Sequence, residues 1–261
     1  MRSRIAGVVV ALGLLSAGAQ AQAGPPPDPP SSGRLPDPLD CALAADPQAV
    51  AAASSDTGQT VTLRTLVISD RVEIARSQEI MERVVAAYRE VGLALDVTHR
   101  RMDLVGDDAV DLIRQTRHAL AWDDVQGYDL VHVLSVAELK AGSGQVAGLA
   151  HCIGGIRYAK YHFATSVSRA NMPEEGVIGP MPVTGDITVF TTRPAVTTAH
   201  EMAHSLGARH EHANCAENAP RAAADGNAAV CTVMDTNFQY RQLHFGTLER
   251  STVRMFAIRY G

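Results

Sequence analysis

Hydrophobic and polar positions alternate with two different periods in the first part of the chain after residue 60. Val61 to Ile68 is rich in β-branched residues, which predicts a strand. Apolar residues then recur at spacings of mostly three and four, which predicts a helix that ends at Gly92. The apolar positions of this helix are Ile74, Met81, Val84, Val85, Tyr88 and Val91. Alternation from Leu93 to Val97 predicts a second strand, and helical spacing returns from Asp107 to Leu120.

Two short apolar runs further along the chain are typical of buried central strands. They are Leu130 to Leu134 and Ile187 to Phe190. Gln145 to Cys152 contains spaced glycines and is less apolar, which favours an edge strand, and the scattered positive charges from Arg157 to Arg169 favour a solvated loop. Strands and helices that alternate in this way predict a mixed sheet covered by helices, an α+β domain with α/β-like layers.

The first 23 residues have the pattern of a secretory signal peptide. Arg2 and Arg4 precede an apolar stretch, and Ala21-Gln22-Ala23 forms a small-x-small cleavage site. We expect cleavage after Ala23, with Ala21 as the second candidate and an uncleaved N-terminal anchor as the alternative. The apolar stretch is shorter than the roughly 18 to 20 residues that span a bilayer. The sequence therefore predicts a secreted or periplasmic protein without stable membrane insertion after signal removal.

Composition divides the remainder of the chain into two parts. Residues 24–60 begin with a stretch rich in Pro, Gly, Ser and Asp, which predicts an extended linker or a short pro-segment. Residues 61–261 contain no second break of this kind and no internal repeat, so they are expected to form one domain.

Composition and charge exclude several classes of protein. The chain has 261 residues, of which 46% are hydrophobic and 20% charged, which excludes a disordered or fibrous protein. Lys and Arg number 23 against 28 Asp and Glu, and no basic run occurs, so we expect no nucleic-acid partner. The four cysteines are too few to frame a disulfide-rich mini-protein.

The most informative segment runs from His200 to His210. Its sequence, His-Glu-Met-Ala-His-Ser-Leu-Gly-Ala-Arg-His, matches the pattern H-E-x-x-H-x-x-G-x-x-H at every specified position. Pro194 suits the first turn of a helix, and Gly207 suits the left-handed residue that ends one. Apolar residues between them form a stripe that would pack against the sheet, namely Val196, Ala199, Ala203 and Leu206.

The spacing of the motif has a chemical reason. His200 and His204 lie four residues apart on one helix face, and the turn at Gly207 can return the chain to bring His210 to the same ion. Three neutral imidazoles leave one open position on a tetrahedral Zn²⁺ ion, where a bound water has a pKa of about 7. Glu201 would take the proton from this zinc-bound water and pass it to the leaving amine. The motif therefore predicts one catalytic zinc ion and hydrolysis of peptide bonds.

Other functions stay open at this stage. A closed structural zinc site would normally use four protein ligands, often cysteines, and needs no glutamate beside the first histidine. The main alternative is a secreted metal-binding effector or binding domain with little or no proteolytic activity. Hydrolysis of a non-peptide amide would use the same residues. For the favoured function, we expect a protein or peptide substrate and a monomeric enzyme.

The segment resembles the zinc signature of the metzincin metallopeptidases. Cys231 to Asp235 resembles the start of the methionine turn that lies beneath the metal in that clan, which makes Met234 its methionine. The adamalysin or reprolysin-like branch is the most similar, because Cys215 and Cys231 occupy similar places around the turn. The resemblance implies a metzincin-type zincin with a twisted mixed sheet, an active-site helix and a small C-terminal lobe after His210. The segment Phe245 to Tyr260 would be a closing helix.

In zincins, the strand at the rim of the active site binds the substrate as an added antiparallel strand. The resemblance places Gly148, Leu149 and Ala150 in this strand, and small side chains would let the substrate approach closely. The alternative is a plain edge strand without a substrate role.

Cysteines and additional histidines have simpler predicted roles. Cys215 and Cys231 could close a loop by a disulfide. Cys41 and Cys152 could form a second disulfide, or Cys41 could instead bind the zinc and keep the enzyme latent. His132 is expected to be a satisfied core or interface residue. His212 and His244 are expected to lie at the surface or to form hydrogen bonds rather than bind metal.

Overall fold

The computed structural model describes residues 60–120, 127–158, 164–172, 193–210, 232–235 and 243–261, and the structural statements below concern these residues. The first half contains β1 (Val61–Asp70), α2 (Ile74–Glu90), β2 (Leu93–Arg101), α3 (Ala109–Ala119) and β3 (Leu130–Ser135). The second half contains β4 (Lys140–Ala141), β5 (Gly144–Gln145), β6 (Gly148–Ala150), the 3-10 turn η2 (Gly155–Tyr158), β7 (Ala164–Arg169), α5 (Arg193–Ser205) and α7 (Thr247–Tyr260). No helix among these residues is long and apolar enough to cross a membrane.

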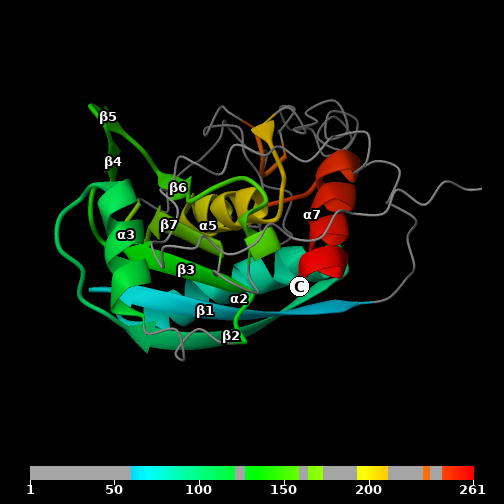
Figure 1. The fold of residues 1–261 in the computed structure, drawn as a ribbon, viewed down its shortest axis with the longest axis horizontal. Coiled ribbons are helices and arrows are strands. Elements are labelled where there is room, and N and C mark those ends of the chain that lie inside the picture. Colours follow the sequence, from blue (N-terminus) through cyan, green and yellow to red (C-terminus); the bar gives the residue numbers. More distant parts are fainter. Residues whose placement is uncertain (1–59, 121–126, 159–163, 173–192, 211–231, 236–242) are drawn as a thin grey trace, which may run out of the picture.

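Five strands form one mixed sheet in the order β2-β1-β3-β7-β6 (Figure 1). The first four run parallel, and β6 pairs antiparallel with β7 at the edge. Strands β4 and β5 form a separate small hairpin. Parallel neighbours need crossover connections, and α2 and α3 supply the first two. The layered α+β fold predicted from the sequence is confirmed.

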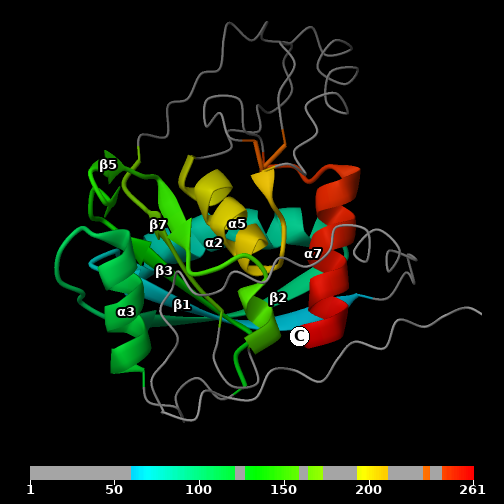
Figure 2. The ribbon, with the colours of Figure 1, turned by 45° about the horizontal axis from the view of Figure 1, so that its top comes forward.

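Side chains alternate between the two faces of the sheet and build a separate core on each. Leu63 and Val67 of β1 face the core that α2, α5 and α7 cover (Figures 1 and 2). Leu66 and Ile68 face the opposite core, which α3 covers. Because both faces are covered, the central strands are buried along nearly their whole length.

Most predicted elements are confirmed with small shifts at their ends. The strand that starts at Val61 extends to Asp70, and the second strand continues to Arg101 instead of ending near Val97. The first two helices lie where the periodicity places them, and Gly92 has the positive φ of 76° expected at the end of a helix. The strand predicted at Ile187 to Phe190 lies outside the described residues.

The prediction of a loop from Arg157 to Arg169 is wrong at its C-terminal end. Residues Ala164–Arg169 form β7, an inner strand of the sheet, and all of them except Arg169 are buried. Their sequence, Ala-Thr-Ser-Val-Ser-Arg, has few apolar residues, so its pattern does not indicate a buried strand. The strand can be buried because its hydroxyl groups have hydrogen-bond partners inside the protein.

Serines of β7 surround a buried histidine of β3. The two ring nitrogens of His132 lie 2.8 Å from Ser166 Oγ and 2.9 Å from Ser168 Oγ. Ser168 Oγ is also 2.8 Å from Thr198 Oγ1 of α5, so this polar cluster connects two strands with the helix above them. Burial lowers the pKa of His132 to about 3. The expectation that His132 is a satisfied core residue is confirmed.

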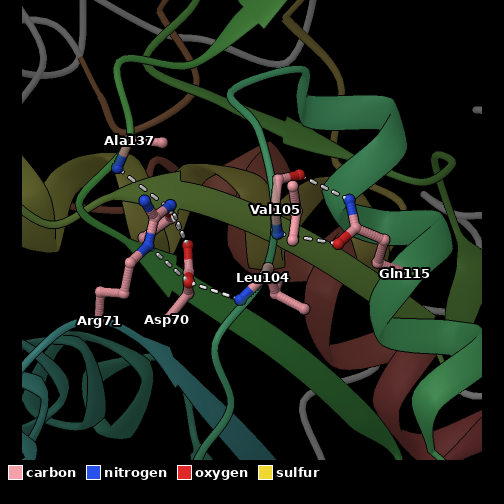
Figure 3. A network of polar contacts seen from close by, with 7 residues as sticks. Asp70, Arg71, Leu104, Val105, Gln115 and Ala137 are labelled. Atoms are coloured by element: carbon pink, nitrogen blue, oxygen red, sulfur yellow. Dashed lines mark hydrogen bonds and ion pairs between the residues drawn. The ribbon is translucent and has the colours of Figure 1, made fainter.

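A second polar network fixes the ends of β1 and β3 (Figure 3). Asp70 is fully buried and accepts hydrogen bonds from Leu104 N–H at 2.9 Å and from the Ser135 hydroxyl at 2.5 Å. Arg71 donates to both of its carboxylate oxygens at 3.0 Å. Because Leu104 lies between β2 and α3, a single carboxylate ties the ends of two strands to the segment that leads into α3.

The predicted edge strand and closing helix are both shorter than expected. Gly148–Ala150 alone joins the sheet, whereas Gly144–Gln145 belongs to the small hairpin. The closing helix predicted at Phe245 to Tyr260 is confirmed as α7, Thr247–Tyr260. Arg254 of α7 donates to the carbonyls of Val91 and Gly92, both at 3.1 Å, which attaches this helix to the turn after α2.

The buried His132 predicts a specific pH dependence of stability. Its folded-state pKa of about 3 lies below its ordinary value of 6.5, so between these pH values the unfolded chain binds a proton that the folded chain does not. The contribution of His132 to the free energy of unfolding therefore decreases as the pH falls through this window, by about 1.4 kcal/mol per pH unit. Urea unfolding of the wild type and of His132→Gln at pH 4.5 to 7 measures this difference in slope.

The exposed His118 provides the control for this measurement. His118→Gln should keep the wild-type slope, whereas His132→Gln should flatten it. Equal slopes for His132→Gln and the wild type would show that the lowered pKa of His132 does not cause the pH dependence.

Candidate metal centre

Helix α5 carries the histidine motif and is buried on all sides. The sequence predicts one apolar stripe, but every residue from Pro194 to Ser205 is buried, because β7, α2, β6, β3 and η2 all contact the helix. Tyr88 of α2 donates its hydroxyl hydrogen to the Ala199 carbonyl at 2.9 Å. Burial raises the pKa of Tyr88 well above its ordinary range, so this hydroxyl stays a donor. The helix is thus held by polar contacts as well as by apolar packing.

The three histidines of the motif converge. Each offers one ring nitrogen, and these three atoms lie within 4.8 Å of one another. His200 and His204 are buried on the helix, whereas His210 approaches them from the turn beyond it and is exposed. The ring centroids are 4.5 to 5.1 Å apart. The structure therefore brings together the three predicted metal ligands.

Gly207 makes the turn that brings His210 back. Its φ of 87° lies in the left-handed region, which confirms the expected end of the helix. A Cβ atom at this position would also collide with the ring of Phe256 in α7. Gly154, in the segment after β6, packs against the same ring and donates its N–H to the His204 carbonyl at 2.7 Å. The end of α5 is therefore enclosed by the C-terminal helix and by the segment that follows the edge strand.

Backbone carbonyls orient two of the rings. His200 Nδ1 lies 2.7 Å from the Val233 carbonyl oxygen, and His204 Nδ1 lies 2.8 Å from the Ala208 carbonyl oxygen. A carbonyl only accepts, so each Nδ1 carries the hydrogen and each Nε2 keeps its lone pair for a metal. This is the arrangement typical of metal-binding histidines.

The distance between two of the ring nitrogens fits a tetrahedral zinc ion. Nε2 of His200 and Nε2 of His210 are 3.2 Å apart. Two nitrogens that bind one tetrahedral Zn²⁺ at about 2.05 Å would be about 3.3 Å apart. Among the described residues, the group that could hold a metal consists of these three histidines. Three protein ligands and one open position are typical of a catalytic zinc site. The donor set therefore fits zinc in kind, and the spacing of the His200 and His210 nitrogens fits it as well.

Glu201 follows His200 on α5, and its side chain lies against the edge strand. Its side chain is buried, and Gly148 of β6 is directly against it. A Cβ atom on Gly148 would lie 2.6 Å from Glu201 Cγ, 2.9 Å from Glu201 Oε1 and 2.7 Å from the Val167 carbonyl oxygen. Such contacts are too short, so only glycine leaves room for the glutamate at this position.

The backbone of β6 alternates between β7 and the outer edge of the sheet. On the β7 side, His151 donates its N–H to the Thr165 carbonyl at 2.7 Å, and the Ala147 carbonyl accepts from Arg169 N–H at 3.0 Å. In an antiparallel pair the groups of intervening residues point the other way. The backbone N–H and C=O groups of Gly148 and Ala150 therefore face the outer edge, while Leu149 packs into the α3 core.

A cavity of about 380 Å³ lies next to the histidines. The residues that line it are Ala150, Cys152, Ile153, His204, Arg209 and His210. Ala150 and the segment after it form one side, and the end of the motif forms the other. The edge strand, the cavity and the three ring nitrogens thus belong to one continuous site.

Met234 is fully buried in the core that α5 and α7 share. It belongs to a turn in which Asp235 N–H donates to the Thr232 carbonyl at 3.2 Å. Val233, directly before it, supplies the carbonyl that orients His200. The turn that contains the predicted methionine is therefore in contact with the metal centre.

The cysteine predictions lie mostly outside the described residues. Cys152 is disulfide-bonded and lines the cavity, but Cys41, Cys215 and Cys231 are not described, so the pairings and the latency hypothesis stay predictions. His212 also lies outside the described residues. The carbonyl of His244 accepts a hydrogen bond from Val233 N–H at 2.9 Å.

Two groups that contact the metal centre or its turn were not predicted from the sequence. One is Glu249 of α7, which is fully buried and contacts the turn of Met234. Its spacing to Val253 and Phe256 places it on the buried face of α7, and a charged residue on such a face is a signal that could have been used. The carbonyl of Val233 leaves no comparable signal in the sequence.

The family comparison agrees with this site. The model of metallopeptidase family M12 matches residues 41–243. Among solved structures, the crystal structure of archaemetzincin from Methanopyrus kandleri is similar, with 16% sequence identity and a TM-score of 0.47 over 75% of this chain and 95% of that chain. The comparison with curated proteins gives no match.

The family match spans more than half of the chain and includes all three converging histidines. The chain therefore belongs to metallopeptidase family M12 and is a zinc metalloprotease of the metzincin type.

Proposed function

We propose that this protein is an exported endopeptidase in which His200, His204 and His210 hold one zinc ion and Glu201 is the general base. The observation that carries the proposal is the convergence of three ring nitrogens beside a buried glutamate on the same helix. When bound, zinc acidifies a water molecule and polarises the substrate carbonyl. The protein's own residues supply the proton transfers and the position of the substrate.

Glu201 is suited to move the proton. Its carboxylate follows the first histidine in the chain and is shielded from solvent by β6 and α5. As general base it takes a proton from the attacking water, and as general acid it gives the proton to the amine that leaves. Burial of a carboxylate destabilises the folded protein, so the presence of Glu201 here favours a catalytic over a purely structural metal site.

The edge strand is suited to hold an extended peptide. Because Gly148 and Ala150 direct backbone groups outward, a substrate segment could pair with them as an added antiparallel strand. Main-chain pairing of this kind is independent of side chains, which suits an enzyme for protein substrates. The neighbouring cavity would hold one substrate side chain.

The second candidate is a secreted metal-binding domain with little or no activity. It would need the three histidines but would not need Glu201 or a glycine that makes room for it. The close fit of Gly148 against the glutamate therefore favours the enzyme.

Replacement of Glu201 by glutamine separates catalysis from metal binding. We expect Glu201→Gln to lower kcat/KM on an unfolded protein substrate at least about 100-fold, because the amide cannot accept the proton. Zinc content should stay at the wild-type level, whereas His204→Ala should lose the metal and a chelator should inactivate the wild type. Glu138→Gln, which changes an exposed carboxylate, is the control. Full activity of Glu201→Gln would refute the proposed mechanism.

Gly148→Ala tests the fit between the edge strand and the glutamate. The added methyl group would displace the Glu201 side chain, so kcat should fall by about 10- to 100-fold, as expected when a catalytic group moves by about 1 Å. Bound zinc should not change.

Gly144→Ala is the matched control for Gly148→Ala. The nearest atom to a Cβ at Gly144 is a backbone oxygen at 3.8 Å, which is an ordinary contact. If the two variants lose activity equally, the loss at Gly148 does not come from Glu201.

Export rests on residues 1–23 and is tested on the full chain. After expression in a bacterial host, intact mass and N-terminal sequencing of the protein outside the cytoplasm should show a mature chain that begins at Gly24, or at Gln22 if cleavage follows Ala21. Full-length protein retained in the membrane fraction would instead support the uncleaved anchor.

A further inference from the structure

A buried carboxylate of the C-terminal helix contacts the turn that supports the metal centre. Glu249 has no exposed surface. Gly246 N–H donates to its Oε2 at 3.0 Å, and the Thr232 hydroxyl donates to its Oε1. Since a buried carboxylate is costly unless its oxygens are hydrogen-bonded, these contacts are the reason it can remain here. One oxygen therefore binds the start of α7, and the other binds the residue that opens the turn.

The turn is held at a second point and contacts the metal centre at a third. Val233 N–H donates to the His244 carbonyl at 2.9 Å, which attaches the turn to the segment before α7. The Val233 carbonyl in turn accepts from His200 Nδ1 at 2.7 Å. A chain of contacts thus leads from Glu249 through Thr232 and Val233 to the first metal ligand.

We propose that Glu249 is a positioning residue for the metal centre, which holds the Thr232–Asp235 turn through the Thr232 hydroxyl and so orients the imidazole of His200. This inference depends on the proposed zinc site. Metal binding would then depend also on Glu249, which lies 49 positions after His200 in the sequence.

The proposal predicts weaker metal binding when the contact is removed. Loss of the partner that orients a metal-binding histidine typically lowers metal affinity about 10- to 100-fold. Glu249 acts one step further away, so we expect the lower end of this range, about 10-fold. The readout is the dissociation constant for Zn²⁺, measured by competition with a chromophoric chelator on the full mature chain.

Two single variants and their combination test the contact. Thr232→Val keeps the shape of the side chain and removes only the hydroxyl, so it should fold, and Glu249→Ala removes the acceptor. Each should weaken Zn²⁺ binding about 10-fold, and the double variant should lose no more than either single variant, because both remove one interaction. Thr232→Ser and Glu249→Gln, which can keep the hydrogen bonds, should bind zinc within about threefold of the wild type.

Arg254→Met is the matched control on the same helix. It removes the contacts of α7 with Val91 and Gly92 but leaves the turn untouched. It should lower the melting temperature without changing zinc affinity. A loss of affinity in this variant as large as in Thr232→Val would show that any loosening of α7 weakens the site, which would overturn the specific role of Glu249.

The remaining outcomes distinguish this inference from the proposed function. Wild-type zinc affinity in both Thr232→Val and Glu249→Ala, or losses that add in the double variant, would overturn the inference alone. If His204→Ala bound zinc as tightly as the wild type, the three-histidine site itself would fail.

Discussion

The site depends on the convergence of three imidazole nitrogens that the chain supplies from both sides of a helix end. The helix alone aligns His200 and His204, but it cannot bring in His210 without the left-handed turn at Gly207. The helix also does not determine which nitrogen of each ring is left to bind the metal. That choice is made by two backbone carbonyls, one in the turn at Ala208 and one at Val233, because each holds an Nδ1 hydrogen.

A helix that presents histidines and a glutamate to a buried site needs support on every side. In α5 much of this support is polar: Tyr88 binds a helix carbonyl, and Thr198 joins the cluster of His132 and Ser168 below. Apolar packing would tolerate small rotations of the helix, whereas hydrogen bonds at fixed distances restrict them. The hydroxyl-rich strand β7 therefore helps to fix the position of the helix that packs on it.

Elements and site residues could be predicted from the sequence where the pattern that identifies them lies within a short stretch of the chain. The β-branched residues of β1 and the periodicity of α2 and α3 located these elements, and the spacing of the motif identified the three converging histidines. Prediction failed for β7, since burial there is balanced by hydrogen bonds with His132 rather than by apolar side chains. The contact of the Val233 carbonyl with His200 could not be predicted either. Every residue has a backbone carbonyl, so the residue type gives no indication, and His200 lies 33 positions away.

Gly148 shows how one small residue can satisfy two constraints that a sequence cannot separate. Its lack of a side chain was expected to serve the approach of a substrate strand, yet the structure shows the same space filled by Glu201. The two demands act in different directions, because the side-chain position faces α5 while the backbone groups face the outer edge of the sheet. The outward backbone groups follow from the register and are shared by Ala150, whereas the space for Glu201 requires glycine. The short β6 is therefore best understood as the element that aligns the proposed base and the proposed substrate on a common backbone.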